Sequence, residues 1–134
     1  MAKSTRPAPT SKSPRASKPG DHEFRSKCSI ARTLEVVGDK WTLLIVRDLL
    51  WHGKHTFAAL QGSAERIPTN ILSDRLQRLM EWGLVRREQY QERPVRFAYY
   101  LTETGQTLEP ALVEIMRWGH GMLDGGMLDR LRRT

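Results

Sequence analysis

The sequence predicts one mostly α-helical domain with a small β-hairpin, and three patterns support this fold class. Apolar residues recur at helical spacing in four successive segments between residues 29 and 82. Two segments that alternate apolar and polar residues then follow, on either side of a proline, as in a hairpin. A further helical pattern begins at residue 102. The chain has 134 residues, of which 39% are hydrophobic, which suffices for one core.

The net charge of +7 is concentrated near the N-terminus. Residues 1–20 carry five basic residues and no acidic one, so they contribute +5 and the remainder only +2. Because this segment consists mainly of Ser, Pro, Lys and Ala, we predict a disordered basic tail over residues 1–22. The domain is predicted over residues 23–124, followed by a basic C-terminal extension over residues 125–134. A basic surface favours nucleic acid as partner before an anionic membrane, unless the tail charges only keep the protein soluble.

The sequence contains no run of 18 apolar residues and no apolar N-terminal segment of the kind found in signal peptides. We therefore expect a cytoplasmic location and no membrane partner. The single cysteine, Cys28, cannot form an intramolecular disulfide. The histidines lack metal-ligand spacing, and His52 and His55 are interpreted as flanking a solvated turn rather than as ligands.

No catalytic motif or Gly-rich phosphate loop is present. Asp39, Asp48 and Asp74 are interpreted as helix caps or helix-surface residues, because no carboxylate pair has a setting for acid–base chemistry. We therefore expect no enzyme, no metal and no cofactor.

Three helices are predicted before residue 63, and each ends at a glycine. The second is apolar nearly all round, which is typical of a helix at the centre of a domain. Their ranges are residues 29–38, ended by Gly38; 39–53, capped by Asp39 and ended by Gly53; and 56–62, capped by Thr56 and ended by Gly62.

The fourth predicted helix, residues 69–82, has two chemically different faces. Pro68 suits its start, with Thr69 as an alternative cap, and Gly83 ends it. The face opposite its apolar stripe carries short hydrogen-bonding side chains instead of the Glu and Lys of a solvated face, which indicates a specific partner. The apolar stripe consists of Leu72, Leu76, Leu79 and Met80.

Residues 84–92 and 95–102 are predicted to form the two strands of the hairpin, with Arg93 and Pro94 at its tip. A last helix begins at Thr102, and Pro110 inside it predicts either a bend or a break into two pieces. This order of helices followed by a basic hairpin is the plan of a winged helix-turn-helix.

The winged helix-turn-helix plan gives the polar face of helix 69–82 a candidate partner in double-stranded DNA. The major groove is about 12 Å wide and admits one helix, whose short polar side chains then reach the base edges. Asparagine can bond adenine bidentately, Ser and Thr can bond several edges, and Asp can accept from cytosine or orient a neighbouring Arg. The candidate base-reading residues are Thr69, Asn70, Ser73 and Asp74.

Basic residues supply candidate contacts to the DNA backbone. Arg93 and Arg96 near the hairpin tip are predicted to enter a minor groove or to bind phosphate. For Arg86 and Arg87 that role and pairing with Glu88 or Glu92 are equally plausible. The candidate phosphate or minor-groove residues are Arg75, Gln77, Arg78, Arg93 and Arg96.

Residues 28–120 resemble the HxlR-type transcriptional regulators, which are relatives of the MarR type. The resemblance rests on a G-x-K-W-x-x-L-I-x-x-x-L pattern from Gly38, an L-x-x-R-L-x-x-L-x-x-x-G-L-V pattern from Leu72, and L-T-E-x-G at 101–105. It implies a homodimeric, sequence-specific DNA-binding protein whose N- and C-terminal helices form the dimer. We expect a repressor, because a small dimer can act by blocking polymerase. Trp41 and Trp118 are expected to anchor the core or the dimer.

Two residues keep two interpretations each. Arg75 either contacts a phosphate or pairs inside the domain and fixes the helix. Cys28 matches a cysteine that family members often carry before the first helix, and some use it to sense oxidants or electrophiles, although Ser29 stands where Pro is frequent. Nearby basic residues and the helix N-terminus favour a thiolate. The alternative is an unreactive thiol at the dimer edge.

An oxidant is therefore a candidate effector, as is a small molecule bound at the apolar dimer interface. A different class of function is a protein–protein interaction module without specific DNA binding, because winged helices also bind proteins. The short polar face and the basic hairpin argue against that alternative.

Overall fold

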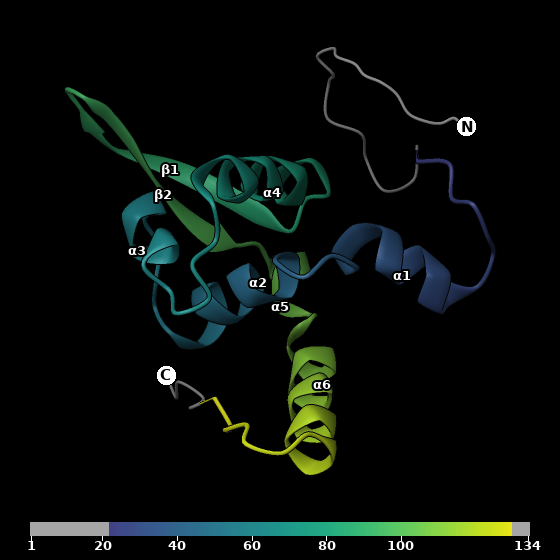
Figure 1. The fold of residues 1–134 in the computed structure, drawn as a ribbon. Coiled ribbons are helices and arrows are strands. Elements are labelled where there is room, and N and C mark those ends of the chain that lie inside the picture. The colour runs from purple at the N-terminus through teal and green to yellow at the C-terminus, as the bar shows by residue number, and fades with distance from the viewer. Residues whose placement is uncertain (1–21, 130–134) are drawn as a thin grey trace.

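The computed structural model describes residues 22–129, and these form helices around a two-stranded antiparallel hairpin (Figure 1). The predicted fold class is confirmed. The tail predicted over residues 1–22 lies, except for His22, outside the described residues, as does the predicted extension beyond Asp129. In chain order the elements are α1 (Ser29–Val37), α2 (Thr42–Trp51), α3 (Phe57–Gln61), α4 (Thr69–Glu81), β1 (Val85–Glu92), β2 (Val95–Leu101), α5 (Glu103–Gln106) and α6 (Glu109–Met122).

Helix α2 lies at the centre of the fold, as its apolar sequence predicts, and α3, α4 and the hairpin surround it (Figure 1). Val46 of α2 and Leu72 of α4 are completely buried, and Leu60 of α3 nearly so. Each such side chain contributes about 1.5–3 kcal/mol of hydrophobic stabilisation. The core therefore fixes α3 and α4 on α2 and leaves one face of α4 pointing away from the protein.

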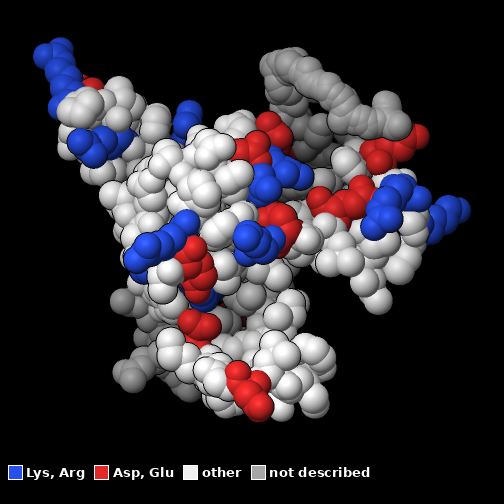
Figure 2. Space-filling model, viewed as in Figure 1, with Lys and Arg blue, Asp and Glu red and all other residues white. Residues whose placement is uncertain are grey.

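Helices α1 and α6 project away from this central body (Figure 1). Each contributes a single buried residue, Val37 from α1 and Leu112 from α6. The visible surface of α6 is largely uncharged (Figure 2). Among the helices of nine or more residues, these two therefore have the least burial against the rest of the chain.

The observed start of α2 differs from the predicted one. The helix begins at Thr42, and residues 39–41 form a turn before it. Asp39 still satisfies the free amides, because its Oδ1 accepts hydrogen bonds from the N–H groups of Trp41 and Thr42 at 2.8 and 2.9 Å. Burial alone would raise the pKa of Asp39, but the hydrogen bonds from Thr42 and Trp41 outweigh it and lower the pKa to about 2.

The two prolines flanking helix starts act as boundaries. Pro68 is the N-cap residue of α4, and Thr69 is already helical, so the alternative cap at Thr69 is wrong. Pro110 lies in the first turn of α6, where a missing N–H leaves no bond unmade. Of the two outcomes predicted for Pro110, the structure shows the break, between α5 and α6.

Residues 52–55 form the predicted loop between α2 and α3, but its two histidines are only partly exposed and have partners within the protein. His52 lies between Asp48 and Asp129, and His55 Nδ1 is 2.9 Å from the carbonyl oxygen of Tyr99. Within residues 22–129, His, Cys, Asp and Glu side chains form no group of three or more that could hold a metal ion. The same part of the chain has no helix long and apolar enough to cross a membrane.

Candidate nucleic-acid interface

Helix α4 presents its predicted polar face to solvent. Its apolar stripe packs into the core through Leu72, Leu76 and Leu79, which forces the opposite side chains outward. In the described part of the chain, Asn70 and Ser73 make no side-chain hydrogen bond, so their polar groups remain available to a ligand. All four candidate base-reading residues, Thr69, Asn70, Ser73 and Asp74, are exposed.

Asp74 and Arg75 are engaged within the protein. Asp74 pairs with Arg75, and its Oδ2 lies 3.8 Å from Nη1 of Arg78. The Nε of Arg75 lies 3.2 Å from Asp39 Oδ1, and the Arg75 side chain is only 17% exposed. This geometry corresponds to the internal-pairing interpretation of Arg75, because the guanidinium joins α4 to the turn before α2. Asp74 correspondingly orients an arginine.

The other candidate residues on α4 differ in their exposure and in the hydrogen bonds that they make within the protein. Thr69 accepts a hydrogen bond from Gln61 of α3, which ties the start of α4 to the preceding helix. Gln77 donates to Glu81 at 3.3 Å, and Arg78 is half exposed. Asn70 is therefore the least committed large polar side chain near the start of the helix.

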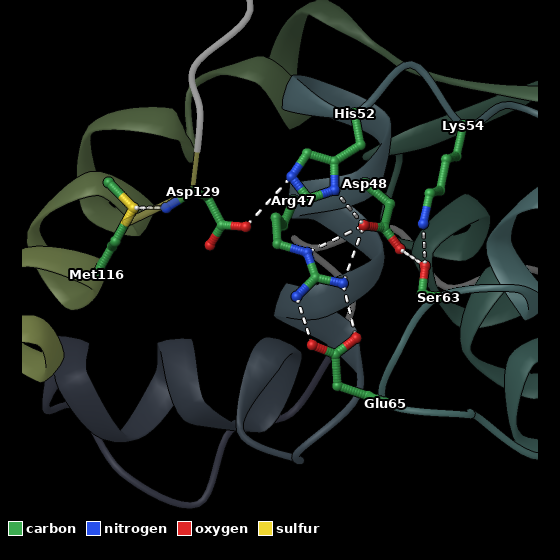
Figure 3. Close-up of polar contacts among 8 residues, drawn as sticks. All are labelled: Arg47, Asp48, His52, Lys54, Ser63, Glu65, Met116 and Asp129. Atoms are coloured by element: carbon green, nitrogen blue, oxygen red, sulfur yellow. Dashed lines mark hydrogen bonds and ion pairs between the residues drawn. The ribbon is translucent and has the colours of Figure 1, made fainter. Parts of the chain in front are cut away.

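An ion-pair network that is buried except at Glu65, and which we call the turn anchor, fixes the α3–α4 turn onto α2 (Figure 3). It consists of Arg47, Asp48, Ser63 and Glu65. Arg47 donates two hydrogen bonds to Glu65, at 2.8 and 2.9 Å, and its Nε donates to Asp48 at 3.0 Å. The second oxygen of Asp48 accepts from the hydroxyl of Ser63 at 2.5 Å.

The turn anchor corrects the prediction for Asp48, which is 2% exposed and not a helix-surface residue. Its burial is tolerable because Arg47 and Ser63 satisfy both carboxylate oxygens. Hydrogen bonds from Arg47 lower the pKa of Glu65 to about 2, and those same bonds raise the pKa of Arg47. Sequence reasoning missed this network; its one signal was an Arg-Asp pair within an otherwise apolar helix.

The hairpin projects from the body and carries basic side chains at its outer end (Figure 2). The strands pair from Val85 opposite Leu101 to Glu92 opposite Val95. The predicted tip is correct, because the two-residue turn between the strands is Arg93-Pro94. The base of the hairpin is attached to the α2–α3 loop, where the N–H of Tyr99 donates to the carbonyl of His55 at 2.7 Å.

The arginines of the hairpin fall into two groups. Arg86 pairs with Glu88, and Arg87 lies 4.0 Å from the ring centroid of Phe97, so both are held near the hairpin base. Arg93 and Arg96 are exposed, and neither forms an ion pair within residues 22–129. The arrangement leaves the two arginines nearest the tip available for contact with an anionic partner.

A helix held on a central core, an outward polar face and a basic hairpin together define a winged helix-turn-helix protein. A model described as "HxlR-like helix-turn-helix" matches residues 36–127. The chain belongs to this family. The match does not include Cys28.

Similar proteins agree with this assignment. Rv3095 of Mycobacterium tuberculosis, an HTH-type transcriptional regulator, is 43% identical over 98 residues, which make up 73% of this chain and 60% of that protein. This chain thus spans about 60% of the length of that relative. The description of this relative as a transcriptional regulator agrees with the class of protein that the sequence predicts.

Solved structures show the same fold. The crystal structure of PA1607 matches with a TM-score of 0.66 and 31% identity, over 82% of this chain and 84% of that one. The redox regulator HypR in its reduced form matches with a TM-score of 0.64 and 33% identity, over 72% of this chain and 95% of that one.

Proposed function

We propose that this chain is a transcriptional regulator that binds a specific sequence in double-stranded DNA as a homodimer. The observation that carries the proposal is the exposed, short polar face of α4, which the turn anchor holds in a fixed orientation. Such a face suits the major groove, where base edges offer hydrogen-bond partners. The description of Rv3095 as an HTH-type transcriptional regulator supports the same class of function. Its site of action is the cytoplasm.

In this proposal the side chains of α4 have different roles in DNA binding. Asn70 and Ser73 read base edges, with Thr69 at the start of the helix and Asp74 beside them. Arg75 positions α4 rather than touching DNA, although a phosphate contact remains the competing role. Farther along, Gln77 and Arg78 meet the DNA backbone.

The wing, residues 86–96, makes the second set of contacts. Arg93 and Arg96 lie in the minor groove or against phosphates, because an unpaired arginine at the tip of a projecting hairpin reaches past the α4 contact. These contacts add affinity with little sequence information. Salt therefore weakens this part of the binding most.

Exposed apolar residues on α1 and α6 support the homodimer. Ile30 of α1 is 72% exposed and Trp118 of α6 is 64% exposed, although both are large and apolar. Exposed apolar side chains that gather on projecting helices mark an interaction surface, and a second copy of the chain supplies the same surface. A two-fold dimer presents two α4 helices to half-sites one helical turn apart. Bound over a promoter, it acts as a repressor.

The test is selection of bound sequences from random DNA, followed by binding measurements on the selected site. Wild type should select two related half-sites. Asn70→Ala should reduce discrimination at one base position by about 1–3 kcal/mol, whereas the control Gln77→Ala should leave discrimination unchanged. Failure to select any sequence, with weak retention on duplex DNA that is lost when the salt concentration is raised, would support the alternative, a protein–protein interaction module.

A second, narrower proposal concerns Cys28 as an oxidant-responsive residue. The thiol is exposed at the N-terminus of α1, the helix proposed to form the dimer, and the structurally similar HypR is a redox regulator. Diamide would oxidise two Cys28 thiols, one from each protomer, to a disulfide and take up their two protons and two electrons. Non-reducing gels and DNA binding before and after diamide test this. Equal response of wild type and Cys28→Ser would refute it.

A further inference from the structure

The segment after α6, residues 123–129, turns back along the molecule (Figure 1). It lines a groove of about 430 Å³. The groove lies between α2 and α6. Its walls are mainly apolar and include Leu43, Trp51 and Met116. We call residues 123–129 the strap, because they run from the end of α6 to the side of α2.

The contacts that fasten the strap meet at Asp129 (Figure 3). The backbone N–H of Asp129 donates to the sulfur of Met116 at 3.2 Å, and its carboxylate lies 3.2 Å from Nε2 of His52. The other ring nitrogen of His52, Nδ1, lies 3.1 Å from the buried Asp48 carboxylate. One imidazole therefore bridges a carboxylate of the core and a carboxylate of the strap.

This bridge depends on the number of protons on the ring. Both contacts are ion pairs, so each attracts the ring strongly only while His52 carries a positive charge. Neutral imidazole has one N–H, whereas imidazolium has two. Histidine is the side chain whose charge ordinarily changes between pH 5 and 8. Only the protonated ring can hold both Asp48 and Asp129.

The surrounding charges decide which contact is lost on deprotonation. Asp48 also accepts hydrogen bonds from Arg47 and Ser63, and Glu65 holds Arg47 in place. Asp48 therefore has other partners besides His52. Within residues 22–129, Asp129 has no other ion-pair partner than His52. When the ring loses its charge, Asp48 keeps Arg47 and Ser63 as partners, whereas Asp129 loses the His52 contact, so the strap side of the bridge is the side released. The other titratable or charged groups around this site are Lys54 beside Ser63, Glu109 on the Trp51 Nε1–H, and His120 and Asp124 in the groove lining.

We propose that His52 is a proton-dependent latch, which fastens the strap over the α2–α6 groove when protonated and frees it when neutral. When the pH rises, the His52–Asp129 contact is lost and the strap no longer covers the groove. The inference concerns α2, α6 and the strap, so it stands independently of the proposed DNA binding.

Hydrogen exchange on the full-length chain tests the latch at pH 6.0 and pH 8.5, with rates corrected for intrinsic exchange. Wild-type amides of residues 124–129 should lose about five-fold in protection at the higher pH, as expected for one charge-assisted contact between partly exposed groups. Amides of α4 should keep their protection. His52→Gln and Asp129→Asn should both abolish the pH dependence of the strap.

Matched controls separate the latch from other titrations in the groove. Asp124→Asn and His120→Gln should retain the wild-type pH dependence, because neither residue belongs to the bridge. A thermal melt of each variant checks that the fold persists. Equal strap protection at the two pH values in wild type, or an unchanged pH response in His52→Gln, would overturn the proposal.

Discussion

The α3–α4 turn and the hairpin tip both carry charged residues, but they use them in opposite ways. In the turn, Glu65 accepts two hydrogen bonds from Arg47, which also pairs with the buried Asp48. At the tip, Arg93 and Arg96 are exposed and form no ion pair within residues 22–129. A buried pair that has lost water holds geometry, whereas an exposed, unpaired cation is free to meet phosphate. Pairing therefore distinguishes the two sets of charges: those of the turn position α4, and those of the hairpin tip remain free for a partner.

The strongest test of this comparison is removal of the buried cation. Arg47→Met should lower the free energy of unfolding by about 3–5 kcal/mol, because Asp48 remains buried without its main partner. Urea unfolding measures the change. The control Arg117→Met removes an exposed pair with Glu114 and should cost about 0.5 kcal/mol or less. A loss below about 1 kcal/mol for Arg47→Met would mean that the turn is not held by this network.

The next effect concerns the turn before α2. Asp39→Ala should cost about 2 kcal/mol, because it removes the acceptor for two amides and a partner of Arg75. The folded pKa of about 2 lies below the ordinary 3.8, so ionised Asp39 stabilises the fold above about pH 4. That contribution is lost as the pH falls from about 4 to about 2, and unfolding curves of wild type and variant should converge there. Asp39→Asn, which keeps the acceptor, should retain part of the stability.

The sequence was sufficient to predict the elements that depend on local patterns. The stripe of Leu72, Leu76 and Leu79 and the polar residues opposite it determine which face of α4 is exposed. Arg93-Pro94 determines the hairpin tip by its turn chemistry. These features follow from periodicity and backbone geometry, which depend only on residues close in the sequence.

Features that depend on distant residues could not be predicted in this way. The burial of Asp48 requires Glu65 and Ser63, which follow it by more than a dozen positions and approach it only after α3 packs on α2. Besides its neighbour Asp74, Arg75 pairs with Asp39, which precedes it by two helices. The residues around His52 predict a loop but not its ion pair, because the partner, Asp129, lies near the far end of the chain. In each case tertiary packing decided the pairing.

The third prediction concerns the exposed arginines of the hairpin tip and rests on the proposed DNA binding. Arg93→Ala and Arg96→Ala should each weaken binding to the selected site by about 1 kcal/mol and reduce the salt dependence by about one counterion. Because neither side chain is paired within residues 22–129, urea unfolding should change by less than about 0.5 kcal/mol. Fluorescence anisotropy at several salt concentrations measures the binding. Unchanged affinity and salt slope would remove the wing tip from the interface.

The smallest effect is expected for the Arg86–Glu88 pair at the base of the hairpin. It shows whether the charges there stabilise the fold, as in the α3–α4 turn, or remain free for a partner, as at the hairpin tip. Arg86 pairs with Glu88, but both side chains are more than half exposed, so solvent screens the attraction. Glu88→Gln should therefore change the free energy of unfolding by about 0.5 kcal/mol or less. It should also strengthen DNA binding slightly, because removal of an acid frees Arg86 for phosphate. Destabilisation above about 1 kcal/mol would place the base with the buried anchor of the α3–α4 turn.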